Sequence, residues 1–183
     1  MANWYQEQLT NKNFLSPIGF IFILDKALKT SFLCQKAEIP TMTLGEVNIP
    51  TRGMVPIPVE GNMNYGDLSI EFLVDEDLRN YMEIHNWIRA LGTPQDYQER
   101  RDWIDKHAKS MTTKDPRFSD ATLQVLNNNN IVNFDVVFKD MFPVNLSTVT
   151  FDVTAGDNNF LTATASFKYT LYEIRNKQSQ TRR

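Results

Sequence analysis

The sequence predicts a mainly β protein with a flanking helix (α+β), in which two packed antiparallel sheets form a barrel or sandwich. Hydrophobic and polar residues alternate over Tyr65–Val74, Ile131–Lys139 and Leu161–Ile174, which is typical of strands with one buried face. One amphipathic helical stripe follows Asp75, and clusters of Gly, Pro and Asn separate the segments. The 183 residues suffice for one sizeable core, so a single domain over 1–183 is expected.

Composition excludes several classes of function. The net charge is -3 and the pI is about 5.4, whereas tight binding to nucleic acid needs a basic patch. The only basic run is the polar tail 175–183, interpreted as a frayed terminus or, alternatively, as a contact to an acidic partner.

Cys34 is the single cysteine, so no internal disulfide can form. The apolar run Ile18–Leu24 is too short to cross a membrane and lacks a secretory leader's basic flank, so we expect intracellular synthesis and no membrane insertion.

The first segment is an arm over 1–16, in which Trp4 and Tyr5 are candidate anchors. Both the odd- and the even-numbered positions of Ile18–Leu24 are apolar, which predicts a strand that is covered on both faces. Ser31–Ile39 is expected to be its hairpin partner, and Pro40 should end it because proline removes a ladder donor.

Prolines and glycines alternate with short extended pieces over 41–66, which predicts a long protruding hairpin that turns at Thr51-Arg52-Gly53. It carries more apolar residues than a free flap needs. An exposed apolar edge invites pairing with another chain, so these residues are predicted inter-subunit contacts. They are Val47, Ile49, Met54, Val55, Ile57 and Val59. The alternative is a loop folded back on its own core.

The helix is predicted to begin after Asp75, the candidate N-cap, and to end at Gly92. Its stripe consists of Leu78, Tyr81, Met82, Ile84, Ile88 and Leu91. His85 is expected to pack within this stripe. The charged segment 93–118 then has Thr93 as a candidate cap and Pro94 at the first helical position, and forms either an exposed helix or a mobile insertion.

The remaining chain predicts two hairpins. Ala121–Leu126 and Ile131–Lys139 flank four asparagines that suit a turn. Pro143 should interrupt any strand there, and Val149–Val153 is expected to pair with one long final strand, Leu161–Ile174. The polar face of that strand is a candidate lining for a lumen. It consists of Thr162, Thr164, Ser166, Lys168 and Thr170.

No catalytic motif emerges. His85 and His107 belong to no metal-binding pattern, and the acids at Asp75–Asp77 are explained by helix capping. No nucleophile has an identifiable base, although two carboxylates could still converge in space as in glycosidases. We therefore predict a protein that is not an enzyme and has no cofactor and no bound metal.

The order of these segments resembles the tail tube proteins of contractile-tailed (T4-like, myovirus) bacteriophages. The resemblance covers roughly Pro17–Ile174 and rests on the stretch Phe32–Pro40, the Pro/Gly-rich hairpin, the run GNMNYGDLSIEFLVDED at Gly61–Asp77, and MFPVNLSTVTFDV at Met141–Val153. This chain departs from the shorter tube proteins in its charged 96–116 stretch and in its tail.

The resemblance implies a structural virion protein, assembled in the host cytoplasm, whose hexameric rings stack into a hollow tail tube for DNA delivery. The implied partners are other copies of this chain, the tail sheath, the baseplate, the tail terminator, the tape measure protein in the lumen and DNA in transit. An acidic subunit would repel phosphate and let DNA slide. Two alternatives stay open: a tube-like baseplate or tail-end protein of the same fold, and a β-rich hydrolase or carbohydrate-binding module.

Overall fold

The structure is a computed structural model that describes residues 13–53, 55–93, 96–108, 115, 117–152 and 160–177. Seven strands form one continuous hydrogen-bonded path, β1-β6-β7-β8-β5-β2, with β9 added to β7. Their bounds are β1 Phe20–Leu24, β2 Cys34–Ala37, β5 Leu68–Leu73, β6 Ser119–Leu126, β7 Val132–Leu146, β8 Thr162–Lys168 and β9 Leu171–Asn176. Every pairing is antiparallel. The predicted antiparallel sheets are therefore confirmed, but the path ends at β1 and β2, so the described strands do not close a barrel.

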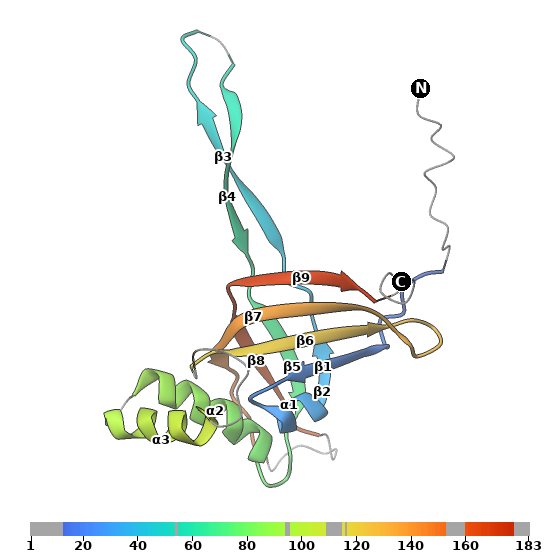
Figure 1. Ribbon diagram of the computed structural model, residues 1–183, viewed down its shortest axis with the longest axis vertical. Coiled ribbons are helices and arrows are strands. Elements are labelled where there is room, and N and C mark those ends of the chain that lie inside the picture. The colour runs from blue at the N-terminus through green and yellow to red at the C-terminus, as the bar shows by residue number, and fades with distance from the viewer. Residues whose placement is uncertain are drawn as a thin grey trace.

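The path bends into two crossing layers because β7 belongs to both. The first part of β7 pairs with β6 and β9, and its end pairs with β8 (Figure 1). Asp140, at φ 53°, lies between these parts. Pro143 was predicted to interrupt the strand, but β7 continues through it and only its register with β8 shifts there. An irregular pairing accommodates the missing N–H.

The final run is also bent. Rather than one long strand, it forms β8 and β9, separated at Tyr169 and Thr170, where the Thr170 N–H donates to the Lys139 carbonyl over 3.0 Å. Its predicted partner is wrong, because residues 149–152 form no strand and β8 pairs instead with β5 and β7. Val153 lies outside the described residues.

The core lies between the layers. Leu68, Ile70 and Phe72 of β5 pair with Phe167, Ala165 and Ala163 of β8, so all six lie on one buried face of the sheet, as the alternation predicted. β1 differs from its prediction: Phe22 and Leu24 are buried, but Ile21 is 46% exposed, so only one face is covered. Its partner is β6 rather than Ser31–Ile39. That segment instead contains part of the short helix α1 (Leu28–Phe32) and β2, which pairs with β5.

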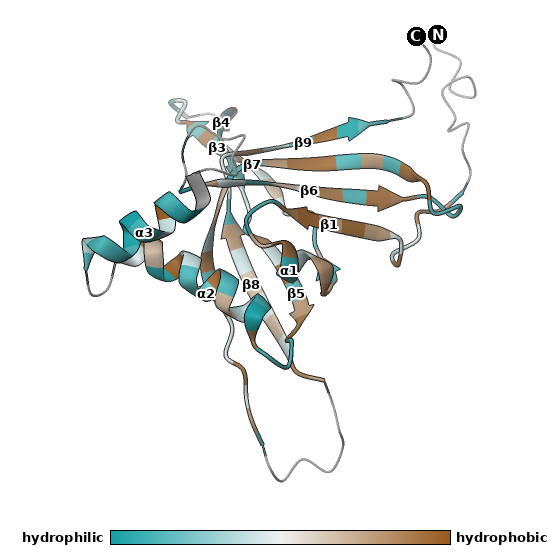
Figure 2. Cartoon of the chain, turned by 60° about the horizontal axis from the view of Figure 1, so that its bottom comes forward, coloured by the Kyte–Doolittle hydropathy of each residue, from teal (hydrophilic) through white to brown (hydrophobic). Residues whose placement is uncertain are grey.

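Two longer helices, α2 (Arg79–Gly92) and α3 (Tyr97–Ala108), lie together beside the sheets (Figure 1). α2 ends at Gly92 as predicted, and it buries Asn80, Ile84, Trp87 and Ala90 against the core. His85 is exposed, which corrects its expected place in the packed stripe. Figure 2 shows α3 as mostly hydrophilic, and this segment takes the form of an exposed helix.

Both predicted caps are wrong. The N-cap position of α2 is Leu78, at φ 56°, which forms no side-chain cap. Asn80 fixes the entry instead: its Nδ2 donates to the Leu73 carbonyl over 2.6 Å, and its Oδ1 accepts from the Asp75 N–H over 3.1 Å. Thr93, at φ 43°, ends α2 by donating its N–H to the Arg89 carbonyl. Pro94 lies outside the described residues.

Candidate assembly surfaces

A two-stranded hairpin, β3 (Met42–Ile49) and β4 (Ile57–Tyr65), projects far from the sheets (Figure 1). Val47 pairs with Val59 and Ile49 with Ile57, so these four side chains share one apolar face. The adjacent pair, Glu46 and Glu60, lies on the opposite face. The apolar residues are accessible, with Val47 57%, Val55 83% and Ile57 56% exposed, which contradicts a loop folded on its own core. Met54 lies outside the described residues.

The hairpin is held by local geometry rather than by a core. A Cβ added at Gly61 would approach the Gly45 carbonyl oxygen to 2.9 Å, so the two strands come too close there for any side chain. At the turn, Gly53 has φ 74° and the Thr51 hydroxyl donates to the Val55 carbonyl over 3.0 Å. These contacts stiffen an element that packs little apolar surface.

A polar strip covers the outer side of β8. Thr164 lies opposite Glu71, and Ser166 lies opposite Ser69 of β5. Lys168, at the end of the strip, forms an ion pair with Asp67, with Nζ and Oδ1 2.7 Å apart. Four of the predicted lumen-facing residues thus share one face of β8, whereas Thr170 lies at the bend between β8 and β9. Thr162, Lys168 and Thr170 are exposed. That this face lines a lumen stays a prediction.

The α2–α3 junction was missed by the sequence reasoning. Trp87 and Trp103 stack with their ring centroids 6.1 Å apart, and the Lys26 Nζ lies 4.7 Å from the Trp103 centroid and 5.3 Å from that of Trp87. Burial lowers the pKa of Lys26 to about 8, partly opposed by the Asp115 carboxylate. The available signal was spacing, since Asn80, Ile84, Trp87 and Leu91 recur at helical intervals.

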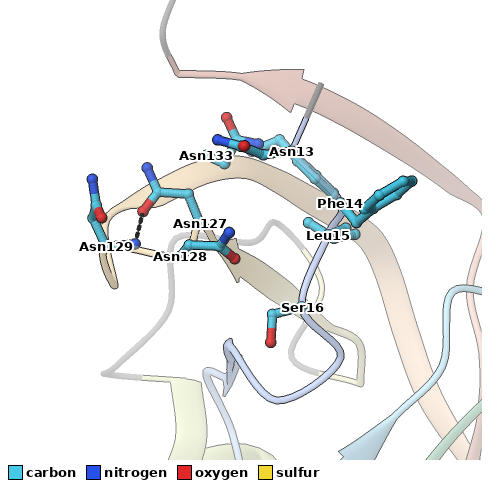
Figure 3. Close-up of a pocket in the computed structure, with 9 residues that line it drawn as sticks. Asn13, Phe14, Leu15, Ser16, Asn127, Asn128, Asn129 and Asn133 are labelled. Carbon is cyan, nitrogen blue, oxygen red and sulfur yellow. Dashed lines mark hydrogen bonds between the residues drawn. The ribbon is translucent and has the colours of Figure 1, made fainter. Parts of the chain in front are cut away.

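An open pocket at one end of the sheet carries amide groups (Figure 3). Asn13, Phe14 and Leu15 face the Asn127–Asn129 turn across it. The Asn127 Oδ1 accepts from the N–H groups of Asn129 and Ile131, over 2.9 and 3.0 Å, so this asparagine builds the predicted turn. The pocket lining contains no acid, base or nucleophile suited to catalysis. Residues 1–12, including Trp4 and Tyr5, and 178–183 of the tail lie outside the described residues.

Within the described ranges, no group of three or more His, Cys, Asp or Glu side chains is placed to hold a metal ion. The side chain of His107 is outside the described residues.

Burial raises the pKa of the Cys34 thiol to about 11, which leaves it a poor nucleophile near neutral pH. No described helix has both the length and the apolar character needed to span a bilayer.

Solved structures share this fold. The tube-terminating cap of the anti-feeding prophage is 11% identical, with a TM-score of 0.61 over 96% of this chain and 99% of that one. The sheath–tube complex of the PVC extracellular contractile injection system is also 11% identical, with a TM-score of 0.59 over 90% and 93%. The anti-feeding prophage baseplate, 6-fold symmetrised, is 16% identical, with a TM-score of 0.57 over 86% and 91%.

Comparison with curated proteins gave no match. The family model described as phage tail tube protein matches residues 5–175, which includes both sheets, the hairpin and the helices. This match spans most of the sequence, and the chain belongs to the phage tail tube protein family.

Proposed function

We propose that the protein is a structural subunit of a contractile-tail tube, in which hexameric rings stack into a hollow conduit for DNA delivery into the host. The observation that carries this proposal is the family match over residues 5–175. The fold shared with a sheath–tube complex and with a 6-fold symmetrised baseplate supports it. The role is mechanical, and no catalytic step is assigned.

Ring closure would use the sheet edges. β1 and β9 flank β6 and β7, while β2 ends the other layer, so three strands of the seven-stranded sheet present an unpaired edge. Edge strands expose backbone donors and acceptors that a neighbouring copy can pair with, and a closed ring removes them. In this arrangement the polar strip of β8, centred on Thr164 and Ser166, would line the lumen. Its hydroxyls carry no charge and Lys168 is paired with Asp67, so the strip would offer phosphate little electrostatic attraction.

The hairpin would supply contacts between rings through Val47, Ile49, Met54, Val55, Ile57 and Val59. A ring that carried six such projections in one direction would add further rings without closing the stack. The proposed partners are other copies of this chain, the tail sheath, the baseplate, the tail terminator, the tape measure protein and DNA in transit. The proposed location is the phage tail, after assembly in the host cytoplasm.

A second candidate has the same fold but a different place in the particle. The cap of the anti-feeding prophage and the PVC sheath/tube terminator, with a TM-score of 0.59 and 12% identity for the terminator, resemble this chain as closely as the PVC sheath–tube complex does. A protein that initiates or terminates the tube would form one ring and stop.

Negative-stain electron microscopy with light scattering, across a concentration series, separates these roles. Long hollow tubes are expected of the main subunit, whereas isolated rings at every concentration would assign the chain to one end of the tube. A monomer at all concentrations, also in the presence of a preformed baseplate, would contradict both assignments.

A further inference from the structure

An apolar groove lies at the opposite end of the molecule from the hairpin. In Figure 1 the β3–β4 hairpin occupies one end of the long axis, and the connection from β5 to α2 occupies the other. The groove at that connection measures about 570 Å³, and its lining includes Leu73, Leu78, Phe151 and Phe160. Phe151 is 74% exposed and Phe160 86% exposed. Two exposed phenylalanines beside one groove are unusual in a free monomer and indicate a docking surface.

Backbone hydrogen bonds hold part of the groove lining. The Leu73 N–H donates to the Leu33 carbonyl over 3.0 Å, and the Val74 N–H donates to the Leu161 carbonyl over 2.8 Å, so Leu33 and Leu161 are tied to the end of β5. Asn80, fully buried, holds the loop from beneath through Leu73 and Asp75. Leu78 presents its side chain from a left-handed backbone conformation, which costs free energy in a residue with a Cβ.

The charges at the two ends are complementary. Arg52 lies exposed at the hairpin turn and forms no ion pair with another described residue. Asp75 and Glu76 belong to the groove lining, and Glu76 is exposed. An apolar hairpin tip with one cation therefore matches an apolar groove with two carboxylates. The two surfaces differ, so copies joined this way form a head-to-tail stack that does not close on itself.

We infer that the groove at the end of β5 receives the hairpin tip of a second copy of this chain in the next ring, with Val55 and Ile57 against Phe151, Phe160 and Leu78, and Arg52 beside Glu76. This inference rests on the proposed tube function and identifies the receiving surface of the ring-to-ring contact.

Charge reversal tests the pairing. Arg52→Glu and Glu76→Arg each place like charges together, and each is expected to weaken one contact about fivefold. Repetition around a ring multiplies this effect, so each single variant should form rings without tubes. The double variant Arg52→Glu/Glu76→Arg restores opposite charges and should recover tube growth. Arg101→Glu, on the exposed part of α3, makes the same charge change as Arg52→Glu but outside the hairpin and the groove lining, and should leave tube length unchanged.

A cross-link supplies a readout that does not depend on electrostatics. In a Cys34→Ser background, Val55→Cys combined with Phe160→Cys should give a ladder of covalent oligomers on oxidation of assembled protein. Val55→Cys combined with Tyr97→Cys, whose α3 position is 76% exposed, should give none.

Each outcome has a distinct meaning. If wild-type protein forms neither rings nor tubes, also in the presence of a preformed baseplate, the proposed function and this inference fall together. If wild-type tubes form but both charge reversals also form tubes of normal length, the function stands and the groove is not the receiving surface. Failure of the double variant to recover, together with no Val55–Phe160 cross-link, would likewise overturn the inference.

Discussion

Trp87 of α2 and Trp103 of α3 lie nearly parallel, with 12° between their ring planes and 6.1 Å between their centroids. Trp87 is 1% exposed and belongs to the core, so this stack connects the otherwise polar α3 to the sheets. The Arg89–Glu99 ion pair, with Nη2 and Oε1 2.7 Å apart, is a second link between the two helices. The pair is half-buried and bidentate, with a second bond from the Arg89 Nε to the Glu99 Oε2 over 3.2 Å. The tryptophan stack also buries apolar surface against the core, so we expect it to contribute more to the attachment of α3.

Trp103→Ala should detach α3 from the body. The loss of the ring pair alone costs about 1 kcal/mol, to which lost packing adds. Urea unfolding monitored by tryptophan fluorescence measures the change in the free energy of unfolding. Tyr97→Ala, at the exposed start of the same helix, should change it by less than about 0.5 kcal/mol. Equal effects of the two substitutions would mean that the stack does not hold α3.

Lys26 predicts a stability that rises in alkali. Its pKa is about 8 in the folded protein, against an ordinary lysine value of 10.5, so between these values the unfolded chain binds more protons than the folded one. The free energy of unfolding contributed by this group therefore increases from pH 8 to 10.5. The raised pKa values of Cys34, about 11, and Tyr169, about 12, act in the opposite direction. The difference between wild type and Lys26→Met, measured by urea unfolding at each pH, isolates the lysine. A difference that stays constant across the interval between the two lysine pKa values would contradict the shift.

Gly61→Ala should disturb the hairpin where its strands approach most closely. The new Cβ would meet the backbone oxygen of Gly45 at 2.9 Å, and overpacking of this kind costs about 1–3 kcal/mol. Because the hairpin projects from the body, faster hydrogen exchange of the β3 and β4 amides is expected, with little change in global unfolding. Gly92→Ala, where nothing lies within 4 Å of the added Cβ, is the matched control and should leave exchange unchanged.

Asn80→Ala should destabilise the whole fold. It leaves the Leu73 carbonyl and the Asp75 N–H without the partner that Asn80 provides, and each buried unsatisfied group costs about 1–3 kcal/mol. Thermal unfolding followed by circular dichroism measures this loss. Asn86→Ala, on the exposed side of the same helix, should have a small effect. A tolerated Asn80→Ala would show that the α2 entry is held by other contacts.

Labelling in assembled tubes locates the lumen. In a Cys34→Ser background, Thr164→Cys should react with a small maleimide but be protected from one coupled to a bulky polymer that cannot enter the tube. Arg175→Cys, on the other layer, should react with both reagents. The reverse pattern would move the lumen to the β7–β9 layer and overturn the assignment of Thr162, Thr164, Ser166, Lys168 and Thr170.

Features that depend on local pattern were predictable from the order of residues alone. Period-two alternation placed Leu68, Ile70 and Phe72 on one buried face, and Ala163, Ala165 and Phe167 on another, because side chains of a strand alternate whatever its partner. The turn at Asn127 and the end of α2 at Gly92 likewise follow from backbone preferences of single residues. The segment order was enough to indicate the family.

Which strands pair and where they bend depends on long-range contacts and was not predictable from local pattern. Pairing of β1 with β6 and of β2 with β5 joins segments far apart in sequence, and no local pattern encodes a partner. The bend at Tyr169 arises because β7 passes from one layer to the other at Asp140. β8 and β9 pair with β7 on the two sides of that point, so the chain between them must bend as well. The start of α2 also depends on tertiary contacts. Asp75 is a residue type that commonly caps helices, but the backbone before α2 is held instead by the buried Asn80 side chain, which bonds the Leu73 carbonyl and the Asp75 N–H.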